Sequence, residues 1–202
     1  MTVAEVPRRR ERPGKAAILR AAVEVMGRDG YEGASLRDMA ARAGVSVAAL
    51  YYHFPSKLDL LREFIDDAYE IVLTRIERRL ALVGPSSSAR LDEAVGTLVA
   101  SVLHDDFAQL AANVAWREHT RLPPPERRSI DEKRARLLDL VAGIVADGVA
   151  AGDFATAEPR EAARAIVTLS TTLVEPYGEI GRPLPEVIAL YQGFARALAR
   201  AR

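Results

Sequence analysis

Residues that can donate hydrogen bonds to phosphate are concentrated in one short run, from Ser35 to Lys57. This run contains two adjacent tyrosines, Tyr51 and Tyr52, followed directly by His53. Phenol hydroxyls, imidazole N–H groups and ammonium groups all donate to phosphate oxygens, and helix N-termini add backbone donors. A cluster of such residues is unusual on a solvated face, and it predicts a surface that contacts a nucleic-acid backbone. The residues expected on or beside this surface are Arg37, Ser46, Val47, Ala49, Tyr51, Tyr52, His53 and Lys57.

Other kinds of site have little support in the sequence. The chain has no cysteine, which excludes a disulfide framework, a thiolate metal site and a thiol nucleophile. Its three histidines, His53, His104 and His119, lack the spacing that places two metal ligands on one helix face. Neither a glycine-rich phosphate loop followed by Lys-Ser/Thr nor a G-x-S-x-G turn occurs. We therefore expect no metal, no cofactor and no catalytic site.

Two short helices joined by a tight turn must position the phosphate-binding groups. Ser35 begins the first helix as a variant capping box, and Gly44 ends it. Ala40 and Gly44 have the spacing of a helix-turn-helix, because Ala allows close helix approach and Gly adopts positive φ. The second helix begins near Val47 and ends before Pro55. The side chains expected to face inward are Leu36, Met39, Ala43, Val45, Leu50 and Phe54.

The composition predicts an all-α protein. The chain has 35 Ala and 22 Leu against 18 Val and 9 Ile, and no alternating stretch bounded by hairpin turns. The 28 basic and 28 acidic residues cancel, but residues 1–57 hold ten basic and six acidic residues, an excess of four. No run of 18 apolar residues occurs, and the basic N-terminus lacks the apolar stretch of a signal peptide. We therefore expect a cytoplasmic protein with no membrane partner.

Apolar periodicity and the positions of Pro and Gly predict about nine helices in a head and a larger body. A basic arm, residues 1–14, precedes a three-helix helix-turn-helix domain at 15–56, and a helical body occupies 57–202. A long helix from Ser56 to Leu82 starts at the head and runs into the body. Residues 159–177 are apolar nearly all round, which predicts a helix buried on every side.

The run GVSVAALYYHFPSKLDLL, preceded by LRDMAARA, resembles the DNA-binding domain of the tetracycline-repressor (TetR) family. The resemblance covers about residues 15–65, and beyond them it rests on chain length and helix count. It implies a head that binds DNA and a helical-bundle body that binds a small molecule and forms a homodimer. We therefore expect a sequence-specific transcriptional repressor that binds a pseudo-palindromic operator in double-stranded DNA and is released by a ligand, and no enzyme.

The resemblance also implies roles for single residues. Ser35 and Arg37 match positions at the start of the supporting helix that contact phosphate and sometimes a base. The positions that match the exposed face of the recognition helix are Ser46, Val47, Ala49 and Tyr51, and those that match the phosphate clamp are Tyr52, His53 and Lys57. Since Val47 and Ala49 cannot hydrogen-bond a base, direct readout would fall to Arg37, Tyr51 and apolar contact with thymine methyl groups.

Two further sites are expected in the body. Helices near 160–177 and 184–199 carry more apolar surface than one body can cover, which predicts a dimer interface. Its candidate residues are Ile166, Leu169, Leu173, Leu190 and Phe194.

Aromatic residues on different helices predict a ligand pocket. Its candidate lining is Phe64, Phe107, Asn113, Trp116, Thr171, Thr172 and Tyr177. Because this lining has few fixed charges, we expect an apolar or weakly polar effector.

Other interpretations remain open at this point. The residues of the dimer set could fill the core of one chain, and Trp116 and Phe107 could do the same. The arginine-rich stretch Arg8–Arg12 is more often a solvated tail than a minor-groove contact. The protein could also be a helical small-molecule-binding or enzymatic protein with an incidental helix-turn-helix, or a DNA-binding protein without a ligand.

Overall fold

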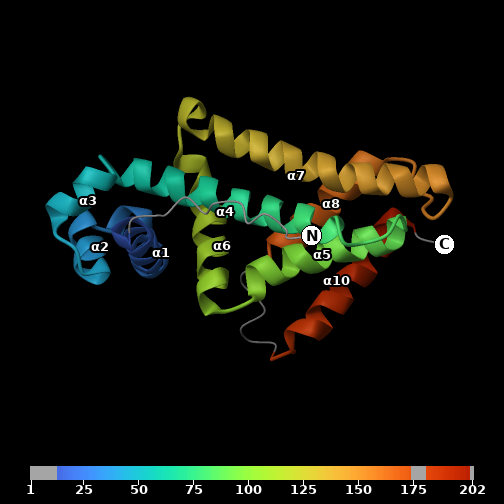
Figure 1. The fold of residues 1–202 in the computed structure, drawn as a ribbon, viewed down its shortest axis with the longest axis horizontal. Coiled ribbons are helices and arrows are strands. Elements are labelled where there is room, and N and C mark those ends of the chain that lie inside the picture. Colours follow the sequence, from blue (N-terminus) through green and yellow to red (C-terminus); the bar gives the residue numbers. More distant parts are fainter. Residues whose placement is uncertain (1–12, 174–180, 201–202) are drawn as a thin grey trace, which may run out of the picture. The chain divides into compact units, whose positions relative to one another are not determined.

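The computed structural model describes residues 13–173 and 181–200, and within these ranges it contains nine α-helices and no strand (Figure 1). The predicted all-α fold with about nine helices is therefore confirmed. The elements are α1 (Pro13–Gly33), α2 (Leu36–Ala43), α3 (Val47–His53), α4 (Lys57–Leu80), α5 (Ser87–Leu103), α6 (Asp106–Glu118), the 3-10 helix η1 (His119–Arg121), α7 (Pro124–Ala151), α8 (Pro159–Thr171) and α10 (Leu184–Ala199). Among these helices, none combines the length and the apolarity needed to cross a membrane.

The helices belong to two compact units, residues 1–61 and residues 62–202. The division falls within α4, a few residues after the boundary expected at 56/57. We call them the first unit and the second unit, and each is described by itself.

The first unit is built on the apolar face of α1. Ile18, Ala22, Val25 and Met26 recur at helical spacing, and all four are buried as their period predicts. The helix breaks at Gly30, whose φ of 70° is a left-handed value that residues with a Cβ rarely adopt.

The turn between α2 and α3 follows the helix-turn-helix pattern. Ala40 is buried, and Gly44 caps α2 in the left-handed conformation, with a φ of 68° and a ψ of 29°. The amide of Val45 donates to the carbonyl of Ala40 at 3.0 Å, which closes the turn. Leu50 on α3 is fully buried, as predicted. The turn therefore holds α2 and α3 over a common core.

The second unit contains one hydrophobic core shared by several helices. In it α7 packs along α8, while α10 packs on α5 and also contacts α8 (Figure 1). Gly148 on α7 allows Phe154 to fold back against this helix, because a Cβ at Gly148 would lie 2.2 Å from the Phe154 ring. Phe154 is consequently among the largest fully buried side chains.

Helix α8 corrects one expectation from the sequence. It ends at Thr171, and it is not buried on every side, because Arg164, Thr168 and Leu169 are exposed. The buried residues of α8, which include Ala163 and Ile166, lie at the spacing of a single helix face. Arg160, Arg164 and Thr168 recur every four residues, so the one-sided pattern was present in the sequence beside the many apolar residues.

Candidate nucleic-acid interface and ligand pocket

Helix α3 presents aromatic side chains to solvent. Tyr51 is exposed, Tyr52 is 73% exposed, and Val47 at the start of the helix is also exposed. Ala49 and His53 are half-buried, and the His53 ring lies edge-on to Tyr52 with 5.3 Å between ring centroids. Because Leu50 anchors the opposite side in the core, α3 offers one fixed face to a partner.

The two serines of the predicted interface cap the helices that carry it. The Ser35 hydroxyl oxygen accepts a hydrogen bond from the Asp38 amide at 3.1 Å and donates to the Asp38 carboxylate at 2.7 Å. The Ser46 hydroxyl oxygen accepts from the Ala49 amide at 3.0 Å. Each serine thus satisfies a backbone donor that a helix start leaves unpaired, and Ser46 keeps its own hydroxyl hydrogen.

Lys57, which the sequence implied as part of the phosphate clamp, makes contacts within the first unit. Its Nζ donates to the backbone carbonyls of Tyr31 at 2.6 Å, Ala34 at 3.0 Å and Glu32 at 3.4 Å. It also lies 4.4 Å from the centre of the Tyr31 ring. Lys57 therefore satisfies the carbonyl groups at the end of α1, and its three N–H donors are already engaged. The residues that share these contacts are 23 or more positions away, so local spacing did not reveal them.

Arg37 remains the unengaged cation of the predicted set. It is exposed on α2 and forms no hydrogen bond or ion pair with any residue that the structure describes. Arg42, one turn further along the helix, is instead paired with Glu24 of α1. Arg37 is thus the side chain on α2 that can reach a phosphate or a base edge without first breaking a contact.

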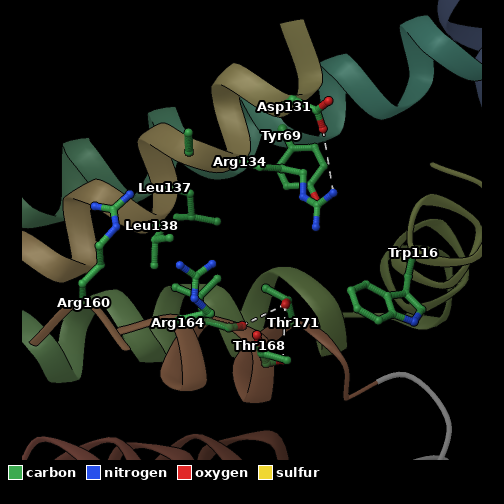
Figure 2. Close-up of a pocket in the computed structure, with 12 residues that line it drawn as sticks. Tyr69, Trp116, Asp131, Arg134, Leu137, Leu138, Arg160, Arg164, Thr168 and Thr171 are labelled. Carbon is green, nitrogen blue, oxygen red and sulfur yellow. Dashed lines mark hydrogen bonds and ion pairs between the residues drawn. The ribbon is translucent and has the colours of Figure 1, made fainter. Parts of the chain in front are cut away.

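A pocket of about 420 Å³ opens in the second unit between α7 and α8, with contributions from α4 and α6 (Figure 2). Tyr69 comes from α4 and Trp116 from α6. Figure 2 shows the guanidinium groups of Arg134 and Arg164 turned towards the space between the two helices, with the Trp116 indole at one end. The lining residues are Tyr69, Trp116, Asp131, Arg134, Ala135, Leu137, Leu138, Arg160, Arg164, Val167, Thr168 and Thr171.

The pocket carries more charge than the sequence predicted. Three arginines and one aspartate belong to the lining, so the expectation of few fixed charges is wrong. The i, i+4 spacing of Arg160 and Arg164 places both on one face of α8, and this was the signal available in the sequence. Nothing local to Arg134 indicates that its helix faces α8, because that pairing is decided by tertiary packing.

The acid–base state of Tyr69 suits a hydrogen-bond donor. Burial raises the pKa of its phenol, and nearby Arg134 opposes this effect only in part. A raised pKa keeps the phenol protonated at neutral pH, since its ordinary value is already about 10. Its hydroxyl makes no hydrogen bond with the residues that the structure describes.

Several residues of the predicted lining lie elsewhere. Phe64 is buried in the interior, while half-buried Phe107, Asn113 and Thr172 do not line this pocket. Phe107 and Trp116 are nine residues apart on α6, about two and a half turns, so they face opposite ways. Of the predicted set, Trp116 and Thr171 do belong to the lining. Tyr177 lies outside the described residues.

The residues predicted for the dimer interface divide between core and surface. Ile166 and Leu173 are 1% and 2% exposed, so they pack within the chain and have almost no surface left for a partner. Leu190 is half-buried. Leu169 on α8 and Phe194 on α10 are exposed, with Phe194 at 45%. Leu198, one turn beyond Phe194, is a further exposed apolar residue that the sequence set did not contain.

Among the described residues, no three His, Cys, Asp or Glu side chains gather as a metal site requires. The geometry therefore defines two candidate sites. One is a helix-turn-helix with an exposed aromatic face, and the other is a side-chain-lined pocket within a helical bundle. A first unit with a helix-turn-helix and a second unit with a pocket in a helical bundle together define a class of protein, the ligand-responsive helix-turn-helix regulators.

Comparison with known proteins identifies the family. Residues 18–64 match the family model of bacterial regulatory proteins, tetR family, and residues 84–197 match the tetracyclin repressor-like C-terminal domain. The HTH-type transcriptional regulator CymR of Pseudomonas putida is 30% identical over 142 residues, which cover 70% of this chain and 68% of CymR. The chain belongs to the TetR family.

Solved structures share the fold at lower sequence identity. A tetR-family regulatory protein from Rhodococcus RHA1 superposes with a TM-score of 0.87 at 24% identity, covering 95% of this chain and 100% of that one. AibR, solved in complex with isovaleryl coenzyme A and operator DNA, superposes with a TM-score of 0.80 at 20% identity, covering 93% and 99% of the two chains.

Proposed function

We propose that the protein is a transcriptional repressor that binds operator DNA through α2 and α3 and leaves it when a small molecule occupies the pocket. The observation that carries the proposal is the α2–turn–α3 arrangement, in which Leu50 holds α3 in the core and Tyr51 and Val47 face solvent. A helix held in this way can enter the major groove of DNA with its exposed residues on the base edges.

The proposed DNA contacts follow from the free groups of this surface. Tyr51 and Val47 would lie in the groove, where a phenol hydroxyl and an apolar side chain can meet base edges and thymine methyl groups. Arg37 would reach the backbone or a base from α2. Ser46 retains a hydroxyl hydrogen for a phosphate, and His53 and Tyr52 stand at the end of the same helix. Lys57 would act indirectly, by holding the end of α1.

We further propose that the repressor is a homodimer formed through α8 and α10. Leu169, Phe194 and Leu198 are exposed apolar residues on two helices that pack together, and a symmetric interface would bury the same residues from both chains. Two heads could then occupy successive major grooves of a pseudo-palindrome about 34–36 Å apart.

The dimer has a direct test by sedimentation at micromolar concentration. The chain has a mass of 22.0 kDa, and the wild-type protein should sediment at twice this mass. Leu169→Asp should shift it towards the single-chain mass, because a carboxylate would be buried in an apolar contact. Leu82→Asp, which places the same change at an exposed site next to α4, is the control. Equal behaviour of the two variants would contradict the interface.

Release would follow from a shift between two conformations. Helix α4 carries Lys57, which holds α1, and also Tyr69, which lines the pocket. A ligand that binds better to a conformation with unsuitably spaced heads lowers DNA affinity by its differential affinity for the two states. AibR, which shares this fold, was solved in complex with isovaleryl coenzyme A and operator DNA, so a protein of this fold can bind both a small molecule and an operator.

The experiment that tests the proposed function is a gel shift with DNA flanking the gene. The protein should retard this DNA but not a shuffled sequence of equal composition, and a metabolite extract should release it. Tyr51→Ala should weaken operator binding, whereas Ile71→Ala, which changes an exposed side chain on α4 outside both candidate sites, should not. Equal retardation of the shuffled DNA would contradict sequence-specific repression. We place the protein in the cytoplasm and assign it no catalytic activity, in keeping with relatives that are transcriptional regulators.

A further inference from the structure

One lining residue of the pocket, Arg134, is a guanidinium whose hydrogen-bond donors have no acceptor among the described residues. Its Nη1 forms a long ion pair with Asp131 at 4.0 Å, which is beyond hydrogen-bond distance (Figure 2). Asp131 is itself engaged, because it accepts a hydrogen bond from Arg127 at 2.9 Å. Arg134 therefore presents a planar set of donors to the pocket, and the surrounding residues do not satisfy them.

The other two arginines of the lining differ from Arg134. Arg160 is paired with Asp139 at 2.6 Å, and Arg164 donates to Glu161 at 3.0 and 3.4 Å. Both are partly neutralised by these carboxylates, which lie outside the lining. Their charge lowers the cost of bringing an anion into the pocket, whereas Arg134, whose ion pair with Asp131 is too long for a hydrogen bond, keeps its N–H donors for one.

A second donor comes from a third helix, α4. Tyr69 of α4 lines the same pocket, and Figure 2 shows its ring beside the Arg134 side chain. A guanidinium and a phenol hydroxyl can donate together to the two oxygens of a carboxylate or to a phosphate. The guanidinium cannot accept a hydrogen bond, so a partner that offers only acceptors, such as an anion, suits it best.

Part of the remaining wall of the pocket is apolar, beside Arg160, Arg164 and the hydroxyl groups of Thr168 and Thr171. Leu138 of α7 and Val167 of α8 border the space, and the half-exposed indole of Trp116 lies at its end (Figure 2). A volume of about 420 Å³ falls within the range of sites for small organic molecules. The walls thus suit a molecule with one charged end and an apolar remainder.

We propose that the effector is an amphipathic organic anion, whose charged group binds Arg134 and Tyr69 and whose apolar part lies against Leu138, Val167 and Trp116. This inference rests on the proposed function and replaces the apolar, weakly polar effector expected from the sequence. The anionic group is either a carboxylate or the phosphates of a thioester conjugate, and the two sources can be separated by experiment.

The experiment titrates the full-length protein with matched probes and follows the fluorescence of Trp116, the only tryptophan. The probes are octanoate and 4-phenylbutanoate, their neutral primary amides, and their coenzyme A thioesters. An anion should bind at least about tenfold more tightly than its amide, because charge-assisted hydrogen bonds are roughly twice as strong as neutral ones. Tighter binding of the free acid identifies a carboxylate as the source, and tighter binding of the thioester identifies the phosphates.

Substitutions assign the selectivity to this pair of donors. Arg134→Gln should weaken the binding of the anion about tenfold and change the affinity for the amide by no more than about twofold, because it removes the charge but retains a polar side chain. Arg134→Lys should recover part of the loss, and Tyr69→Phe should cause a smaller loss with the ring kept. Arg128→Gln, the same change on an exposed part of α7 outside the lining, is the control and should behave as wild type.

The outcomes separate this inference from the proposed function. If no anion of the panel binds more tightly than its amide in the Trp116 titration, or if Arg134→Gln and Arg128→Gln behave alike, the inference is overturned. Operator binding in a parallel gel shift would leave the repressor standing in that case. Failure of the wild-type protein to select any operator DNA would instead overturn the proposed function, whatever the probes do.

Discussion

The two candidate sites are built in opposite ways. The nucleic-acid interface comes from one continuous run, Ser35 to Lys57, and its helices start and turn through the local contacts of Ser35, Gly44 and Ser46. The pocket collects side chains from α4, α6, α7 and α8, with Tyr69 and Thr171 about a hundred positions apart. A site made by local contacts can be recognised from spacing, whereas a site made by packing requires the fold.

The two units are also stabilised by different interactions. In the first unit, buried apolar residues such as Leu50 and Phe54 lie beneath short helices. In the second unit, α4 is joined to α7 by charged side chains, with Lys133 reaching Asp66 at 2.8 Å and Glu70 at 3.2 Å. The first unit therefore depends on a small apolar core, whereas α4 and α7 share an apolar core and also ion pairs that pH can change.

The largest expected effect comes from the core of the first unit. Leu50→Ala should destabilise this unit by about 2–5 kcal/mol, because it removes a fully buried side chain and leaves a cavity. Trp116 reports on the second unit alone, so the loss should appear in circular dichroism and leave the Trp116 transition in urea unchanged. A matching shift of both signals would show that the two units unfold together and would contradict their separate cohesion.

A smaller effect is expected at the α4–α7 ion pairs. Lys133→Met should destabilise the second unit by about 1–3 kcal/mol, because it removes hydrogen bonds to a partly buried carboxylate. Arg136→Met, which breaks the more exposed pair with Glu77 on the same two helices, is the control and should cost at most about 1 kcal/mol. The Trp116 transition measures both variants, and equal losses would contradict the importance of burial.

The same ion pairs predict a dependence on pH. Burial raises the pKa of Asp66, but hydrogen bonds from Lys133 and Ser129 outweigh this effect and leave the pKa below its ordinary value. A carboxylate with a lowered folded pKa contributes stability above its unfolded value, about 3.9, and loses it as pH falls through the folded value. Acid titration of Asp66→Asn should therefore lack this component. An identical acid transition in the variant and the wild type would contradict it.

The next effect distinguishes a structural lysine from a DNA contact. Lys57→Met should destabilise the first unit by about 1–2 kcal/mol, because three carbonyl groups at the end of α1 lose their donor. At a temperature where the variant is folded, its operator affinity should depend on salt as the wild type does. A salt slope reduced by about one unit would instead identify Lys57 as a phosphate contact.

The smallest effect on stability, and the clearest effect on DNA, is expected at Arg37. Arg37→Ala should leave the unfolding free energy within about 0.5 kcal/mol, since the side chain is exposed and forms no contact with the described residues. It should reduce the salt slope of operator binding by about one unit, and change the sequence preference where Arg37 reaches a base. Arg128→Ala is the matched control, and an equal salt slope in both variants would contradict the assignment.

The sequence by itself determined the elements and the type of interface. The high Ala content predicted the all-α class. The capping serines and Gly44 make contacts within a few residues, so the turn between α2 and α3 and the outward position of Tyr51 and Tyr52 followed from local rules. The buried face of α1 likewise followed from its period, because any packed partner would cover the same stripe.

Only the tertiary structure decided which long side chains serve which purpose. Lys57 holds the end of α1, Ile166 and Leu173 enter the core while Leu169 and Phe194 stay exposed, and Arg134 faces a pocket that Phe107 does not line. These outcomes depend on how helices distant in sequence pack together, and packing geometry is set by many contacts at once. The spacing of residues along the sequence does not show these contacts, because the residues that meet between packed helices lie tens of positions apart.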